Sequence, residues 1–168
     1  MKIGILSDTH NAEHNTRAAL GILRERGIDR VIHCGDITTP EIVHLFAGFE
    51  VAFVFGNMDS HRTDLIDAAR RIGVPPPKLV QEVEMAGKTI AACHGSDHSV
   101  LYRLMMGGKY PYVCHGHTHE RRNEFRSAYS VRLINPGALG GNQPQTRSFC
   151  ILDVTADTVE FVELPALF

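Results

Sequence analysis

Two histidines, His117 and His119, stand two residues apart directly after an apolar run that ends at Cys114. In a helix, side chains at this spacing point to different faces, whereas a strand end or a tight loop lets both point into one space. Neutral imidazole is the commonest metal ligand in proteins, so the pair indicates a metal site. The alternative is a polar loop that happens to contain histidines, and the rest of the chain distinguishes the two.

Metal-competent side chains also follow four other apolar runs, each with the length of a buried strand. These runs are residues 2–6, 30–34, 51–55 and 88–93. The groups that follow them are Asp8, His10, Asp36, Asn57, Asp59 and His94. Ligands of α/β sheets bind at the carboxyl ends of the strands, so we expect these groups to meet. Any one of them alone fits an ordinary cap or turn, but their joint occurrence at five strand ends predicts a metal centre.

The predicted ligands mix carboxylates, imidazoles and an amide and include no thiolate, which suits Mn²⁺, Fe, Ni²⁺ or Zn²⁺. Asp59 is expected to support the Asn57 loop by hydrogen bonds, and the remaining seven ligands match two ions better than one. Asp36, in the middle of the set, is the natural bridging carboxylate. Two ions about 3.5–4 Å apart clamp the attacking and leaving oxygens of an in-line displacement and lower the pKa of a bound water. This chemistry predicts hydrolysis of a phosphate ester.

Apolar periodicity predicts the elements that would position these groups in the first half of the chain. Strands alternate there with helices, which predicts parallel β-α-β units. The helices are expected over residues 11–26, 39–47 and 62–72. Thr39 before Pro40 is expected to cap the second of them, with proline at the first helical position.

The second half is expected to differ, because hairpins replace most of the helices after the extended Pro75-Pro76-Pro77 joint. The hairpins are expected over residues 79–93, 124–134 and 148–162, with a short helix over 100–106 and a strand over 111–114. The two halves together predict an α/β (α+β) fold with two sheets packed face to face and helices outside.

The bulk composition excludes several classes of protein. With 168 residues, the chain fits a single domain over 1–168. The formal net charge of -2 leaves no basic footprint for nucleic acid or a membrane surface, and no apolar run reaches the roughly 20 residues that span a bilayer. The four cysteines lie in apolar runs without CxxC spacing, which predicts reduced thiols in a cytoplasmic protein.

Taken in order, the motifs resemble the signature of the calcineurin-like metallophosphoesterase superfamily, over nearly the whole chain. The motifs are Asp8-x-His10, Gly35-Asp36, Gly56-Asn57-x-Asp59, His94-Gly95 and Gly116-His117-Thr118-His119. Ser7-Asp8-Thr9-His10 and Ile134-Asn135-Pro136-Gly137 are similar to its compact, YfcE-like phosphodiesterase branch. The resemblance implies a four-layer αββα sandwich of two mixed sheets, with two metals at the strand ends.

The resemblance also implies roles for the ligands. Asp8, His10, Asp36 and His119 would hold one metal, and Asp36, Asn57, His94 and His117 the other. Mn²⁺ or Ni²⁺ are the expected ions, with Fe or Zn²⁺ as alternatives. A metal-bridging hydroxide would attack phosphorus in line, while Asn57 stabilises charge on the non-bridging oxygens. The implied function is a metal-dependent phosphodiesterase acting on a small-molecule phosphodiester or nucleotide-like substrate.

Met58 departs from the family pattern, in which many members have a histidine that helps to protonate the leaving group. A thioether cannot donate a proton, so activity should favour acidic leaving groups such as aryl alcohols. Asp97 or His98 is a candidate for the missing general acid, with helix capping and solvent exposure as the alternative.

Two other functions stay open at this point. The same fold serves as a scaffold in the retromer coat, where catalysis is thought to be degraded or lost. Met58 is the feature of this sequence that keeps a scaffold function open. A phosphomonoesterase on the same site depends on pocket shape. The resemblance also implies a homodimer or higher homo-oligomer, which exposed edge strands in the second half would support. His33 and His115, which precede ligand loops, are expected to orient ligands or to be ordinary buried residues.

Overall fold

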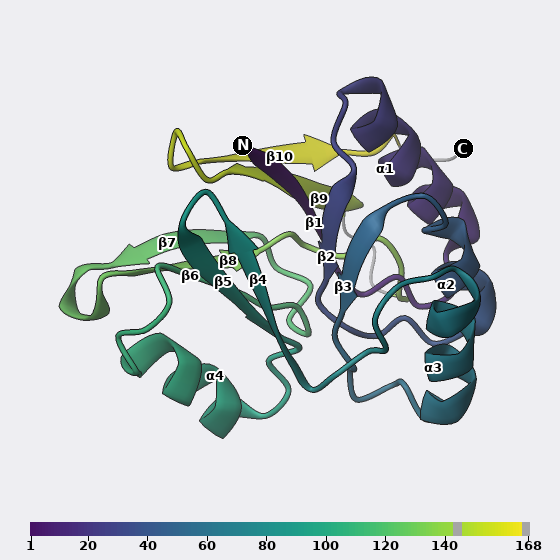
Figure 1. The fold of residues 1–168 in the computed structure, drawn as a ribbon, viewed down its shortest axis with the longest axis horizontal. Helices are drawn as coiled ribbons and strands as arrows, with labels where there is room; N and C mark the ends of the chain where they lie inside the picture. Colours follow the sequence, from purple (N-terminus) through teal and green to yellow (C-terminus); the bar gives the residue numbers. More distant parts are fainter. Residues whose placement is uncertain (143–145, 166–168) are drawn as a thin grey trace.

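The computed structural model describes residues 1–142 and 146–165. The chain folds into two five-stranded sheets that pack face to face (Figure 1). The first sheet has the strand order β10-β9-β1-β2-β3, and the second has the order β4-β5-β6-β8-β7. Both sheets mix parallel and antiparallel pairs, and helices cover their outer faces. This architecture confirms the expected four-layer α/β (α+β) sandwich.

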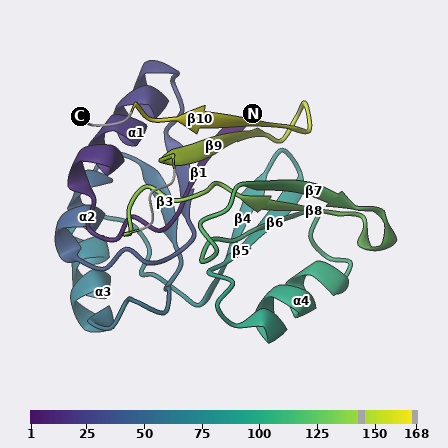
Figure 2. The ribbon, with the colours of Figure 1, turned by 180° about the vertical axis from the view of Figure 1, so that it is seen from behind.

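The first sheet is built on three parallel strands: β1 (Lys2–Leu6), β2 (Arg30–His33) and β3 (Glu50–Phe53). One helix follows each strand: α1 (Glu13–Glu25), α2 (Pro40–Leu45) and α3 (Arg62–Arg71). All three lie on the outer face of this sheet, as Figures 1 and 2 show from opposite sides. Their apolar residues recur at helical spacing and bury a stripe against the sheet, with Leu20 and Leu23 of α1 fully buried.

The second sheet begins with an antiparallel hairpin, as its alternating pattern predicts: β4 (Val80–Met85) and β5 (Lys88–Cys93). Three further strands complete it: β6 (Tyr112–Cys114), β7 (Arg122–Arg126) and β8 (Val131–Asn135). Among the described residues, one α-helix, α4 (His98–Met106), lies on its outer face (Figure 2).

The carboxyl-terminal hairpin, β9 (Ser148–Asp153) and β10 (Thr158–Glu163), joins the first sheet and not the second. β9 pairs antiparallel with β1, so that Ile5 lies opposite Cys150. β1 is therefore an inner strand with a neighbour on each side. The sequence predicts the hairpin itself, but not the sheet to which it belongs.

Three apolar clusters hold the layers together. One lies between the first sheet and its helices, one between the two sheets, and one between the second sheet and α4. The period of two along β6 illustrates the layering: Tyr112 and Cys114 face the cluster between the sheets, and Val113 faces α4. His115 continues this alternation toward the outer face.

The predicted start of α2 is confirmed in position, since Thr39 is its N-cap residue and Pro40 is its first helical residue. Thr39 precedes Pro40 at the start of α2, but its side chain makes no cap hydrogen bond. Its hydroxyl donates instead to Asn11 Oδ1 at 2.8 Å and ties α2 to the loop after β1. In the described part of the chain, no helix has the length and apolar character needed to cross a membrane.

Candidate metal centre

The loops after β1, β2, β3, β5 and β6 end on the same edge of the two sheets, and they bring most of the predicted ligands together. Two groups of side chains place one ligand atom each within 4.8 Å of one another. The groups are Asp8, His10 and His119, and Asp8, Asp36 and His94. The first sheet and the second sheet both contribute to each group, so the centre lies where the sheets meet.

Asp8 is the middle of the first cluster. Its Oδ1 lies 3.2 Å from His119 Nε2 and 3.8 Å from His10 Nε2, and the two imidazole nitrogens are 3.2 Å apart. Asp8 is fully buried, and Oδ1 has no hydrogen-bond partner among the described residues. An unpaired carboxylate oxygen in the interior is expensive, by several kcal/mol or more, unless a cation faces it. These three atoms therefore fit a metal ion.

The other oxygen of Asp8 fixes the orientation of this carboxylate. Oδ2 accepts hydrogen bonds from the Ser7 hydroxyl at 2.5 Å and from the His117 backbone N–H at 3.1 Å. The latter bond links the β1 loop to the β6 loop across the two sheets. Gly116 is required at this junction, because a Cβ there would overlap Ser7 Oγ.

His94 presents a lone pair to the second cluster. Its Nδ1 donates to the Cys34 carbonyl oxygen at 2.8 Å, because a carbonyl can only accept, and Nε2 is thereby left as an acceptor. Nε2 lies 2.9 Å from Asn57 Oδ1 and 3.4 Å from Asp36 Oδ2. Three acceptors that face one another at these distances need a proton or a metal ion between them.

Asp8 is the residue that both groups share, and Asp36, a member of the second group, also contacts the first. Its Oδ2 is 3.6 Å from His10 Nε2 in addition to its contact with His94. Its Oδ1 accepts from the Met58 backbone N–H at 2.8 Å. Asp59 supports this loop, because its carboxylate accepts from the backbone N–H groups of Gly56, Asp36 and Thr38. The supporting role expected for Asp59 is confirmed.

His117 is less closely held than the other predicted ligands. Its side chain is exposed, and its ring packs against that of His94 with centroids 5.2 Å apart. His119 packs in the same way on His10, at 5.1 Å. The two-residue spacing therefore sends one histidine to each cluster.

Backbone strain is concentrated in these loops. Five of the seven predicted ligands have a positive φ between 42° and 68°. They are Asp8, His10, Asp36, His117 and His119. Non-glycine residues rarely adopt this region, and each such residue costs about 1–3 kcal/mol. Strain at the ligands indicates that their positions serve binding and not stability.

The two central groups carry opposed pKa shifts in the metal-free protein. Burial alone would raise the pKa of Asp36, but His94, the Met58 amide and His10 hold it below its usual value. Burial alone would lower the pKa of His94, but Asp36 and Asp8 raise it. The neighbouring carboxylates thus shift His94 toward its protonated form, and a proton bound there competes with a metal ion.

The candidates for a general acid lie outside these clusters. Asp97 is the N-cap of α4, where its carboxylate accepts from Ser99 and from the Val100 amide, and these bonds lower its pKa. A carboxyl held in the ionised form is poorly suited to donate a proton. His98 is exposed at the first residue of α4. Capping and solvent exposure describe both residues.

A cleft of about 580 Å³ opens beside the first cluster. His10, His119 and the exposed Met58 line it, together with Arg147. The Arg147 guanidinium donates to the carbonyl oxygens of Gly140 and Gly141 and so holds a cation beside the ligands. Sequence reasoning missed Arg147, because it follows no motif.

Asn135 is a further residue that positions the site. Its buried amide donates to the Gly116 carbonyl oxygen and to Thr118 Oγ1, both at 3.0 Å. The end of β8 therefore braces the loop that carries His117 and His119. The Asn-Pro-Gly turn in the sequence indicated a turn near the site, but not this bracing.

Comparison with known proteins identifies the family. The sequence model of the calcineurin-like phosphoesterase superfamily domain matches residues 1–157. The chain belongs to the calcineurin-like phosphoesterase superfamily. It is 33% identical over 158 residues to phosphodiesterase MJ0936 of Methanocaldococcus jannaschii, a match that covers 91% of this chain and 93% of that protein. The chain is therefore a phosphoric ester hydrolase of this superfamily.

Solved structures of this superfamily share the fold. One, described as a novel archaeal phosphodiesterase, has a TM-score of 0.90 at 32% identity and covers 98% of this chain and 100% of its own. YfcE, a phosphoesterase from E. coli, has a TM-score of 0.68 at 20% identity, covering 96% and 98%. Vps29 of Entamoeba histolytica, solved with Zn²⁺, has a TM-score of 0.69 at 18% identity, covering 98% of each chain. The last two likenesses are of fold alone.

Proposed function

We propose that the protein is a metal-dependent phosphodiesterase whose centre holds two divalent ions. The observation that carries this proposal is the buried, unpartnered Oδ1 of Asp8 between two imidazole nitrogens, with Asp36 Oδ2 placed between the two clusters. Asp8, His10, Asp36 and His119 would hold one ion, and Asp36, Asn57, His94 and His117 the other. A phosphodiester, and not a monoester, is favoured by the activity named for the relative at 33% identity.

Bound divalent ions would supply Lewis-acid stabilisation of charge on phosphoryl oxygens and a lowered pKa for water. The residues of the chain do the rest. Arg147 places a positive charge in the cleft and favours an anionic ester there. The Asn57 amide lies at the rim of the second cluster, where it can stabilise developing negative charge. Mn²⁺ or Ni²⁺ suits this donor set best, with Fe or Zn²⁺ as alternatives.

Proton supply to the leaving group is the weak point of this site. Met58 lines the cleft with His10 and His119 but has no proton to give. Asp97, with its lowered pKa, is engaged as a helix cap. Esters with acidic leaving groups are therefore the preferred substrates.

The test is turnover of bis(4-nitrophenyl) phosphate by metal-free protein to which single divalent ions are returned. Activity should require the ion, should be lost on adding chelator, and should fall about 10²-fold in His117→Ala. His14→Ala removes an exposed histidine on α1 and is the matched control. Unchanged turnover in His117→Ala would contradict the assignment of this residue.

The rival reading is a scaffold on the same fold. It predicts protein with no bound metal after purification and no turnover with any of the ions. A cytoplasmic location and a homo-oligomeric state stay predictions from the sequence. All four cysteines are free and buried, and burial raises the pKa of each thiol, which fits a protein that uses no disulfide.

A further inference from the structure

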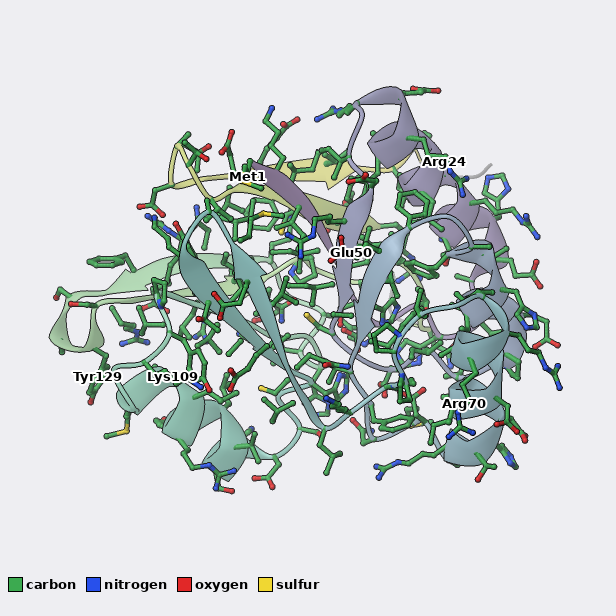
Figure 3. The ribbon with its side chains drawn as sticks, viewed as in Figure 1. Met1, Arg24, Glu50, Arg70, Lys109 and Tyr129 are labelled. Carbon is green, nitrogen blue, oxygen red and sulfur yellow. The ribbon has the colours of Figure 1, made fainter. Side chains whose placement is uncertain are left out.

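The outer face of the second sheet has a hollow of about 360 Å³ that the metal centre does not use. It lies between α4 and the strands β7 and β8, because a single helix covers only part of this face. We call it the α4 hollow. Its walls include Leu101, Tyr102 and Met105 of α4 and Tyr129 after β7. Figure 3 labels Tyr129, beyond the end of β7 and near α4.

The α4 hollow adjoins the second ligand cluster. Gly95, which directly follows His94, lines it. Thr118, which stands between His117 and His119, lines it as well. When a substrate is held at the predicted ligands, the part that is not cleaved therefore lies close to the hollow.

One wall of the hollow is cationic. Arg122 and Arg126 of β7 line it, and Glu124 lies between them on the same face, since residues two apart in a strand point the same way. Glu124 meets the Nε of both arginines, at 3.4 and 2.8 Å. Within the part of the chain that the structure describes, neither guanidinium has another hydrogen-bonded or ion-paired partner. Two arginines against one carboxylate leave a net positive wall with terminal N–H groups available to an anion.

The floor of the hollow carries an unsatisfied acceptor. His115 is 3% exposed, and its Nδ1 donates to the Gly116 carbonyl oxygen at 3.1 Å. Its Nε2 is then an acceptor, and it has no hydrogen-bond partner among the described residues. A buried polar atom without a partner is destabilising, and a donor from a ligand would satisfy it.

The remaining walls are apolar and partly aromatic. Tyr102 is 57% exposed although it stands beside Leu101 and Met105, and Leu133 of β8 lies opposite. A flat ring fits such a surface, since aromatic and aliphatic walls with a few polar groups are typical of small-molecule sites.

We propose that the α4 hollow binds the part of the substrate that is not cleaved, and that this part is a nucleotide group. Its base would lie against the walls of Tyr102 and Leu133, and an N–H of the base would donate to His115 Nε2. A second phosphate, beyond the scissile one, would bind Arg122 and Arg126. This inference rests on the proposed function, because it assigns the substrate class of the same site.

The kinetic test compares two esters with the same leaving group. One is thymidine 5′-(4-nitrophenyl phosphate), and the other carries an additional 3′-phosphate. The ratio of their kcat/KM values should favour the second ester about tenfold in the natural protein. The ratio should fall toward one in Arg122→Gln and in Arg126→Gln. Arg103→Gln, which removes an exposed arginine of α4 outside the hollow, is the matched control and should keep the ratio.

A binding test separates this inference from the proposed function. Thymidine 3′,5′-bisphosphate is titrated into chelator-treated protein by calorimetry. Binding should be saturable, about tenfold weaker in Arg122→Gln, and weaker for the analogue methylated at the ring N–H that would meet His115. Binding without turnover of any diester would support the hollow and contradict the phosphodiesterase. Turnover with no binding, and with no preference for the 3′-phosphate, would overturn the hollow and leave the phosphodiesterase in place.

Discussion

The two sheets contribute to the site in different ways. The first sheet carries the proposed oxygen ligands, Asp8, Asp36 and Asn57, and one proposed imidazole ligand, His10. The second sheet supplies imidazoles alone: His94, His117 and His119. Among the described residues, three helices cover the first sheet and form with it a cluster of twenty-two buried apolar residues, whereas the cluster under α4 has six. The first sheet therefore carries the carboxylates of the candidate centre above a large apolar cluster, and the second sheet carries imidazoles beside a smaller one.

This difference separates two tasks of an enzyme. Carboxylates hold divalent ions most effectively when packing fixes them, and the first sheet provides that packing. In the proposed centre, three of the four imidazole ligands come from the second sheet, and each would make metal affinity depend on pH because it must lose its proton to bind. The sparse cover of the second sheet also leaves room for the α4 hollow. In the two proposals, anchoring of the ions and choice of substrate thus fall to different layers of one fold.

The strongest test of the comparison is Asp36→Asn against His117→Ala. Asp36 faces both clusters, so its loss should lower kcat/KM by about 10³-fold or more, against about 10²-fold for His117, which faces one. Turnover of an aryl phosphodiester with saturating metal measures both. A larger effect at His117 than at Asp36 would place the main anchor in the second sheet and reverse the comparison.

The packing of the two halves can be compared by Leu23→Ala and Leu104→Ala. Leu23 is fully buried beneath α1, and Leu104 lies at 8% exposure beneath α4. We expect the free energy of unfolding to fall by about 4 kcal/mol for Leu23 and about 2 kcal/mol for Leu104, since the smaller cluster can relax into the hollow. Denaturant unfolding of the metal-free protein provides the measurement. Equal losses would show that the second sheet is packed as firmly as the first.

Acid should destabilise the first sheet through His33. Burial lowers the pKa of His33 from 6.5 to about 4. Between pH 6.5 and pH 4, His33 is therefore protonated in the unfolded chain and neutral in the folded chain. Stability is complete above pH 6.5 and is lost as the pH falls toward 4. Between pH 7.5 and 5 this one group should contribute a loss of ~2 kcal/mol. His33→Asn removes the titrating group, so the change in the free energy of unfolding between pH 7.5 and 5 should shrink by that amount. An unchanged pH dependence would show that His33 does not titrate in this way.

The smallest expected effect is a gain in catalytic activity. Met58 lies in the cleft, on the side of the first sheet, without a proton to donate. Met58→His should raise kcat/KM for esters of poorly acidic alcohols by about tenfold and change aryl esters less. Met58→Gln, similar in size but unable to act as an acid, is the control. A series of leaving groups of graded pKa should show a shallower dependence in the histidine variant only.

Local features of the fold were predictable from the sequence, and long-range strand pairings and contacts were not. The strands and helices follow from apolar periodicity and turn residues, which act over a few positions. The pairing of β9 with β1 depends on which sheet edge offers the better partner, and no local signal specifies it. Thr39 carries the pattern of a helix cap, but the proximity of Asn11 in three dimensions gives its hydroxyl another partner.

The residues of the candidate site show the same difference between local and long-range features. Asp8, His10, Asp36 and His94 were predictable because each ends a buried strand, and such ends meet on one edge. Arg147 and Asn135 were not predictable, because they reach the site from segments without a motif. The α4 hollow depends on how much of a sheet one helix covers, which is a property of tertiary packing.

The pairing of Ile5 with Cys150 has a consequence for the order in which the protein forms. β1 is synthesised before β9, so one of its edges stays open until β9 has been made. Strand pairs between distant segments form slowly, and an open edge of an apolar strand attracts other chains. Asp8 and His10, among the earliest ligands to be synthesised, follow a strand that is among the last to be enclosed. During synthesis, the proposed ligands of the first sheet are therefore present before the sheet that positions them is complete.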